Sequence, residues 1–404
     1  MPNTNQPRVY SGDRIDTLDG VRGLAMLAVL VDHSAMWITP TSTLDRAAQA
    51  VTGSCWSGVD LFFVLSGFLI TGILLDARGG QHYFRSFYAR RVLRIFPLYY
   101  LSIALVILAS FIPLVAHHFP DAAREIRHVQ PWYWTYTTNY LIVVHGWPAA
   151  PMRTAHLWSL AVEEQFYLIW PALVLLVDRR TLTRICIGLL IVCPLLRIAL
   201  FLAGTPPRDL VVMTPTRIDT LALGALLAIA ARSDGGLARW RRVLAYVAIP
   251  SVILLASTLT FRIRVANESP EIATIGFSLI AVIAGTFVTF AATTPAGSLA
   301  HRVLAHPALR AVGRYSYAMY IFHLAVVGLL HARGLAPDAM PTVLGSHLPA
   351  QFAFTVLCFA VTYAIAFVSW RLVEHPILEL KRYFPYDREP ASVSVRYVSD
   401  RRLA

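Results

Sequence analysis

Charged residues are scarce in this chain of 404 residues, at 14% of the total, whereas 56% of the residues are apolar. A soluble domain usually carries about 25% charged residues. This shortage, together with a mean hydropathy of +0.57, excludes a soluble globular protein. The composition predicts a polytopic membrane protein.

Cysteines are few, and none follows the spacing of a disulfide framework or a metal site: Cys55, Cys186, Cys193 and Cys358. We interpret them as packing residues. Three histidines near an acidic stretch also lack metal-ligand spacing, so we expect no metal: His117, His118 and His128. A cleavable signal peptide is not evident, because the first apolar run carries internal charges and no small-residue cleavage site. We expect that run to remain as a membrane anchor.

Ten apolar stretches have the length of a membrane-spanning helix: 18–37, 57–77, 95–116, 157–177, 184–203, 218–231, 243–261, 272–292, 315–331 and 349–370. The predicted fold class is therefore an all-α polytopic transmembrane helix bundle of about ten spans. An eleventh candidate, 132–147, is short, aromatic and polar. We interpret it as an interfacial or re-entrant segment.

Arginine is concentrated in alternate loops when 132–147 is not counted as a crossing. The arginine-rich segments are 78–94, 179–184, 232–242 and 302–314, and the other loops are nearly neutral. The positive-inside rule then places these loops and both termini in the cytoplasm. Membrane topology thus accounts for the net charge of +12, and nucleic-acid binding is not expected.

The domain organisation follows from these spans. We divide the chain into a cytoplasmic N-terminal segment (1–14), a transmembrane domain (15–378) and a cytoplasmic tail (379–404). The tail is arginine-rich and lacks a nucleophile motif, so we expect it to be disordered or to lie along the membrane surface.

Two polar residues stand inside the first apolar stretch. A charge such as that of Arg22 costs roughly 2.5–3.5 kcal/mol at the centre of a bilayer. Arg22 and His33 share one helix face about 16 Å apart, and Asp19 lies on that face too. Taken singly, Arg22 suits an arginine that snorkels to the headgroups, and His33 a satisfied interior histidine. Because Arg22, His33 and Asp19 share one helix face, together they indicate a functional site.

The depths of the other charged residues point to a segregated site. At 1.5 Å per residue, Glu163 and Glu164 lie about 9–10 Å below the outer face, nearly level with His33 at about 8 Å. Asp60 is also in the outer third. Permanent cations gather at the inner end: Arg22, Arg91 and Arg94. This pattern predicts a reaction centre near the outer leaflet that receives an anionic ligand from the cytoplasm.

Four motifs occur in order along the chain: LDGVRG at 18–23 followed by His33, GVDLFFVLSGF at 58–68, FYARRVLRIFPLY at 87–99 and HLWSLAVEEQFY at 156–167. Three more follow: RIDTLALG at 217–224, GRYSYAMY at 313–320 with His323, and RLVEHP at 371–376. Together they resemble the acyltransferase-3 family of membrane acyltransferases over roughly residues 15–378.

The resemblance implies transfer of an acyl group, usually acetyl, from cytoplasmic acyl-CoA to a hydroxyl of a glycan or glycosylated molecule. Arg22 and His33 match the family's Arg-x10-His motif, and Arg91 and Arg94 match its Arg-x-x-Arg motif. On this basis Arg91 and Arg94 bind the CoA phosphates, and Arg22 holds the pantetheine arm or the thioester.

The same resemblance assigns the catalytic set. His33 acts as general base on the acceptor hydroxyl or is transiently acylated, two routes that the sequence leaves open. Glu163 or Glu164 orients the His33 ring. Asp19 is also assigned to the catalytic set. Many relatives also carry an extracytoplasmic hydrolase-like domain, which is not seen here. We therefore expect the membrane domain to complete the transfer alone or with a partner, such as a second copy or a polysaccharide-assembly protein.

Candidate acceptor-binding residues are Asp60, Ser66 and Asn139. Asp60 also suits an ion pair with Arg217, and Ser66 suits close helix packing. Alternative functions are acyl transfer to a small secondary metabolite such as a macrolide sugar, a proton-coupled transporter, or a non-catalytic subunit of a polysaccharide machine. A transporter should show inverted repeats, and none is evident. The expected location is the bacterial cytoplasmic (inner) membrane.

Overall fold

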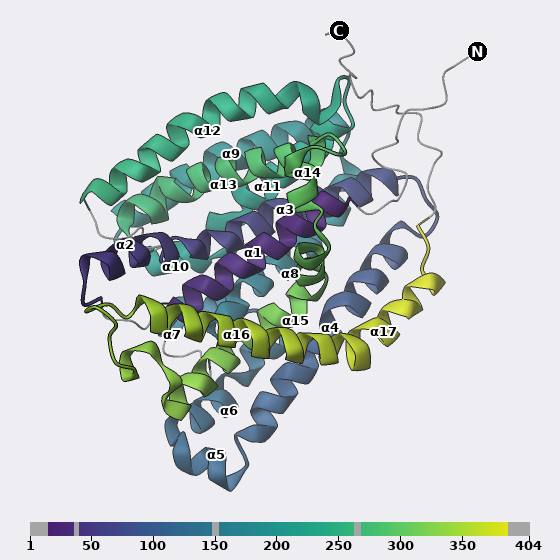
Figure 1. Cartoon of the computed structure of the whole chain (residues 1–404). Helices are drawn as coiled ribbons and strands as arrows, with labels where there is room; N and C mark the ends of the chain where they lie inside the picture. The colour runs from purple at the N-terminus through teal and green to yellow at the C-terminus, as the bar shows by residue number, and fades with distance from the viewer. Residues whose placement is uncertain (1–14, 36–39, 148–152, 262–267, 387–404) are drawn as a thin grey trace.

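The computed structural model describes residues 15–35, 40–147, 153–261 and 268–386. The long helices are α1 (Asp16–Ala35), α3 (Gly58–Asp76), α4 (Tyr83–Ala109), α8 (Trp158–Leu176), α9 (Arg179–Leu202), α11 (Thr214–Ala231), α12 (Gly236–Phe261), α13 (Phe277–Thr293), α15 (Pro307–Leu330) and α16 (Leu348–Ser369) (Figure 1). Shorter helices connect them: α2 (Thr43–Thr52), α5 (Pro113–His118), α6 (Pro120–Trp134), α7 (Thr138–His145), α10 (Pro207–Val212), α14 (Leu299–Leu304) and α17 (His375–Glu379).

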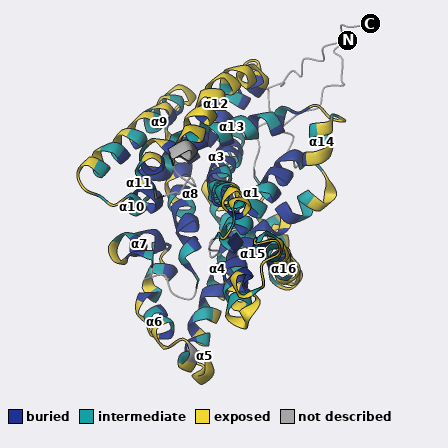
Figure 2. Cartoon of the chain, turned by 60° about the vertical axis from the view of Figure 1, so that its left-hand side comes forward, coloured by how far each residue is buried: buried dark blue, intermediate teal, exposed yellow. Residues whose placement is uncertain are grey.

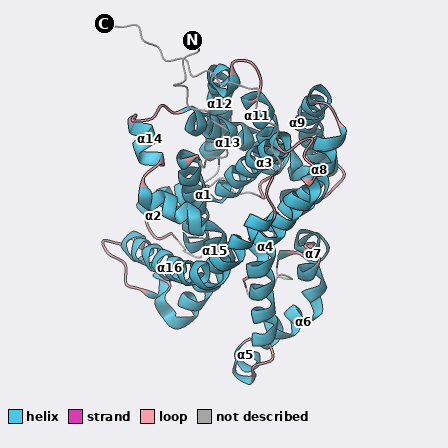
Figure 3. Ribbon diagram, turned by 90° about the vertical axis from the view of Figure 1, so that its right-hand side faces the viewer, coloured by secondary structure: helices cyan, strands magenta, loops and turns pink. Residues whose placement is uncertain are grey.

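Each of the ten predicted spans corresponds to one long helix. Nine of these helices are long and apolar enough to cross a membrane, counting only the described residues. The tenth, α1, has 20 residues, but it carries Asp16, Asp19, Arg22 and Asp32. The described chain contains no strand (Figure 3), so the all-α polytopic bundle is confirmed.

The outer helices show the surface that such a bundle offers to lipid. Of the span in α12 only 11% is buried, against 72% of the span in α11 (Figure 2). The exposed side chains of α12 are largely apolar and include Val243, Ile249 and Ile253. An apolar, exposed surface of this length fits contact with lipid tails.

The start of the third span differs from the sequence-based prediction. Hydropathy predicts that span at 95–116 and leaves the arginines of 78–94 in a loop. In the structure α4 begins at Tyr83, so four of these arginines lie on its first turns: Arg85, Arg90, Arg91 and Arg94. A hydropathy average misses this region, because arginines alternate with the buried side chains of Tyr83 and Phe87. The averaged stretch is polar, although the helix is amphipathic.

The segment 132–147 is divided between two helices. α6 ends at Trp134, Tyr136 adopts a positive φ of 52°, and α7 then has only eight residues. Neither part of the segment has the length of a span, in line with its interpretation as a non-crossing segment.

Glycines let α1 and α15 pack with their backbones in contact. A Cβ on Gly313 would lie 2.0 Å from the Asp19 carbonyl oxygen, and one on Gly23 would lie 2.3 Å from the Leu309 carbonyl oxygen. His33 and His323 lie ten residues beyond these glycines. The two helices run in the same direction, so their packing brings both histidines to the same level.

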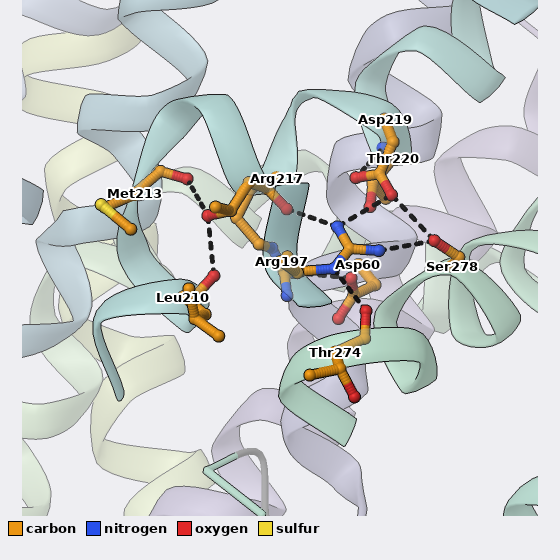
Figure 4. A network of polar contacts seen from close by, with 10 residues as sticks. Asp60, Arg197, Leu210, Met213, Arg217, Asp219, Thr220, Thr274 and Ser278 are labelled. Atoms are coloured by element: carbon orange, nitrogen blue, oxygen red, sulfur yellow. Dashed lines mark hydrogen bonds and ion pairs between the residues drawn. The ribbon is translucent and has the colours of Figure 1, made fainter. Parts of the chain in front are cut away.

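A buried polar network joins α9, α11 and α13 (Figure 4). The fully buried guanidinium of Arg197 donates to the Thr216 and Thr274 carbonyl oxygens and to Asp219 and Ser278, at 2.5–2.9 Å. All three nitrogens of the guanidinium donate hydrogen bonds. The bundle therefore tolerates this buried charge. The network fixes α11, along which α3 packs.

Candidate active site

An arginine-rich cavity of about 490 Å³ opens between α1, α3, α4 and α15. Seven cationic side chains line it: Arg22, Arg90, Arg91, Arg94, Arg232, Arg314 and Lys381. Among the residues that the structure describes, only two carboxylates do so: Asp76, which pairs with Arg232 at 2.5 Å, and Asp19, which lies 3.8 Å from Arg22. This excess of positive charge suits a ligand with several negative charges.

Arg91 and Arg94 differ in the ion pairs that they form within the protein. Arg94 lies 3.3 Å from Glu374, whereas the guanidinium groups of both arginines face two aromatic rings each. Arg91 forms no ion pair with a carboxylate among the described residues, and its buried Nε lacks a hydrogen bond. Arg91 therefore has the greater capacity to bind an anion.

A second cavity of about 120 Å³ adjoins the first, because Arg22, Arg91 and Arg94 line both. Its remaining lining mixes polar, aromatic and aliphatic side chains and includes Ser66, Ser159, Glu163, Tyr167 and Tyr320. The two cavities thus join a cationic chamber to a smaller one, in which Glu163 lies with the three arginines. The expected separation of cations from acid and base groups along the membrane normal stays a prediction.

Glu163 and Glu164 occupy different environments. Glu163 lines the second cavity and accepts hydrogen bonds from Ser66 Oγ at 2.9 Å and from the Tyr167 hydroxyl at 3.2 Å. Adjacent residues of a helix point about 100° apart, and Glu164 is not among the residues that line this cavity. Glu163 is the carboxylate placed to influence a ligand there.

Tyr320 closes the second cavity and separates it from a cluster of histidines. Its hydroxyl donates to the His156 carbonyl oxygen at 2.9 Å and lies 2.5 Å from Ser159 Oγ. Its ring packs against His156 and His323, with ring centroids 5.3 and 5.5 Å apart. Tyr320 thus stands between the second cavity and these histidines, and His33 lines neither cavity.

The structure gives His33 a different partner from the one expected. His33 Nδ1 lies 2.7 Å from His323 Nε2, and the rings meet edge to edge, with centroids 4.9 Å apart and planes inclined by 25°. The expectation that Glu163 or Glu164 orients this ring is not met, since the Glu163 oxygens are engaged by Ser66 and Tyr167. The signal for His323 in the sequence is its place just after the GRYSYAMY motif.

Two candidate acceptor-binding residues are instead engaged within the bundle. Asp60 is fully buried and accepts from Arg217 Nη2 at 2.6 Å, which is the alternative that the sequence offered. Asn139 donates to the Val212 carbonyl oxygen and to Thr214, and it accepts from Gln165. Neither residue lines the two cavities, whereas Ser66 lines the second.

The C-terminal boundary of the folded domain lies beyond the expected residue 378. Arg90 Nη1 donates to the Lys381 and Phe384 carbonyl oxygens at 3.1 and 3.0 Å, and its guanidinium stacks on the Tyr386 ring. Lys381 and Tyr386 line the arginine-rich cavity. Residues 379–386, predicted to belong to a disordered or membrane-surface tail, therefore form part of its wall. Segments 1–14 and 387–404 lie outside the described residues.

Comparisons with known proteins agree with the resemblance. A family model described as an acyltransferase domain matches residues 15–371. The peptidoglycan O-acetyltransferase OatA of Listeria monocytogenes is 28% identical over 388 residues, covering 91% of this chain and 56% of the relative. The O-acetyltransferase OatA of Staphylococcus aureus is 26% identical over 391 residues, covering 92% and 58%.

The chain therefore spans less than two thirds of the length of these relatives. No solved structure matches the chain. Because the family model covers most of the sequence, the chain belongs to the acyltransferase-3 family of membrane acyltransferases.

Proposed function

We propose that this protein is an acyl-CoA-dependent O-acyltransferase of the bacterial cytoplasmic membrane. It moves an acyl group, most simply acetyl, to a hydroxyl of a cell-surface glycan of the peptidoglycan type, the acceptor named for one of its relatives. Both termini and the arginine-rich cavity face the cytoplasm, as the arginine distribution favours.

The observation that carries this proposal is the pair of adjoining cavities that share Arg22, Arg91 and Arg94. CoA carries phosphates, and guanidinium groups bind phosphate through paired charge-assisted hydrogen bonds. The phosphates occupy the arginine-rich cavity, with Arg91 as the main contact. The acyl-pantetheine arm passes Arg22 into the second cavity and reaches Tyr320.

His33 acts beyond Tyr320 as the catalytic base. Its ring takes the proton of the acceptor hydroxyl while the hydroxyl oxygen attacks the thioester carbonyl. The carbon–sulfur bond then breaks, and the CoA thiolate recovers the proton from the imidazolium. Transient acylation of His33 followed by transfer to the hydroxyl gives the same products. Glu163 lies with Arg22 and Arg91 in the lining of the second cavity.

The test uses the purified full chain in lipid nanodiscs with acetyl-CoA and soluble peptidoglycan fragments. We expect release of CoA thiol that depends on the acceptor, and a mass increase of one acetyl group on the glycan. Mass spectrometry of surface glycans from cells with and without the gene provides the cellular readout. Unchanged surface glycans, together with no acceptor-dependent thiol release, would refute the proposal.

A further inference from the structure

The hydrogen bonds of His323 determine where its ring carries hydrogen. His323 Nδ1 lies 2.7 Å from the Tyr320 carbonyl oxygen. A carbonyl oxygen can only accept, so Nδ1 of His323 must be the donor. A neutral imidazole has one N–H, so Nε2 of His323 carries a lone pair and can only accept.

The same reasoning then applies to His33. The contact between His33 Nδ1 and His323 Nε2 is 2.7 Å, and His323 Nε2 is the acceptor. The hydrogen must therefore lie on His33 Nδ1. In the neutral ring this leaves the lone pair on His33 Nε2, the nitrogen that faces away from His323.

The surroundings favour neutral rings. His323 is fully buried and its hydrogen-bonded partner His33 is half-buried, and two imidazoles in contact at such a site cannot readily both be charged. The titratable groups that face this pair are His156, from the segment before α8, and Tyr320 of α15. No carboxylate among the described residues forms an ion pair or hydrogen bond with either ring of the pair.

On the basis of the proposed function, we propose that His323 is a positioning residue for the acyl transfer. It accepts the Nδ1 hydrogen of His33 and so holds the ring with the Nε2 lone pair available to the acceptor hydroxyl. In many enzymes a carboxylate fixes the tautomer of a catalytic histidine. Here a second histidine, fixed in turn by the Tyr320 backbone carbonyl, has that role.

This arrangement also serves the protonated intermediate. When His33 Nε2 takes the hydroxyl proton, Nδ1 remains a donor and still has His323 Nε2 as acceptor. The charged ring thus keeps a hydrogen-bond partner in a site that gives it no counter-ion among the described residues. The contact depends on the parallel packing of α1 and α15, where Gly23 and Gly313 allow the backbones to touch.

Two substitutions separate this role from packing. His323→Phe keeps an aromatic ring but removes the acceptor, whereas His323→Gln keeps an amide oxygen that can accept from His33 Nδ1. For loss of an orienting partner we expect kcat of His323→Phe to fall about 10- to 100-fold, with unchanged acetyl-CoA affinity. His323→Gln should recover most of that loss. Equal loss in both variants, or near-normal kcat in His323→Phe, would overturn the proposal.

The tautomer itself can be measured without turnover. Nitrogen-15 NMR of the histidine-labelled wild-type protein in nanodiscs, with His33→Ala to assign the signal, should show hydrogen on Nδ1 of His33. His156→Phe alters packing in the same cluster but leaves the His33 partner in place, so it should keep this tautomer. Hydrogen on Nε2 of His33 in the wild-type protein would overturn the inference. Because no substrate is needed, this result is independent of whether the proposed function holds.

Discussion

Replacement of Arg91 by alanine is the perturbation that separates donor binding from stability. Arg91 lines both cavities, forms no ion pair with a described carboxylate, and has a buried Nε without a hydrogen bond. The alternative target, Arg94, lies 3.3 Å from Glu374, whose side chain is 3% exposed. Loss of Arg94 would leave that buried carboxylate without this partner, which destabilises a protein for reasons unrelated to the ligand.

A hydrogen bond to a charged group contributes about 1.5–3 kcal/mol. A difference of about 1.4 kcal/mol corresponds to a tenfold change in Kd. Arg91→Ala should therefore raise the Kd for acetyl-CoA about 10- to 150-fold. Arg91→Lys should recover only part of this loss, because an ammonium group cannot form the paired contact of a guanidinium. Isothermal titration of acetyl-CoA into the nanodisc-embedded protein measures the effect.

The matched control is Arg85→Ala, which removes the same charge from the same helix. Arg85 is exposed and does not line the arginine-rich cavity. Its replacement should leave the affinity within about twofold, since screened surface charges contribute little. An equal effect of the Arg85 and Arg91 substitutions, or no effect of Arg91→Ala, would refute a direct phosphate contact.

Three further outcomes are expected. Glu163→Gln should lower kcat more than Glu164→Gln in steady-state assays, because only the first carboxylate lines the second cavity; the reverse order would contradict the assignment. Gly67→Ala should destabilise the protein by about 1–3 kcal/mol in thermal unfolding, since its Cβ would lie 2.0 Å from a backbone carbonyl oxygen. A Cβ added at Gly188 would meet no neighbouring atom within 4 Å, so Gly188→Ala is the control and should be tolerated. A cysteine in place of the exposed Gln81 should be labelled only after the cells are permeabilised; labelling in intact cells would reverse the topology.

The number and type of the long helices could be predicted from the sequence, because hydropathy is a local property. Each span is an apolar run, and the membrane requires its backbone to form a helix. The start of α4 could not be predicted in this way. Its arginines reach into a cavity formed by distant helices while Tyr83 and Phe87 are buried, and a local average cannot register that division.

Five residues of the predicted site line one cavity, but the sequence did not predict the partner of His33. Depth along a helix places His33 level with Glu163, yet depth says nothing about the direction in which a side chain points. Glu163 faces Ser66 and Tyr167, while His33 meets His323, 290 residues away. That contact results from the packing of α1 against α15, which no single segment determines.

The central claim is that His33 performs the chemistry while the arginines hold the donor. Its most direct test is the single-turnover rate of His33→Ala in nanodiscs with acetyl-CoA bound and peptidoglycan fragments added. We expect normal acetyl-CoA affinity and a rate reduced at least about 10²- to 10⁴-fold, the contribution of general acid–base catalysis. The wild-type rate should fall as the pH is lowered, because a protonated ring can neither accept a proton nor attack a thioester. A well-folded His33→Ala protein that transfers acetyl groups at a near-normal rate would contradict the account.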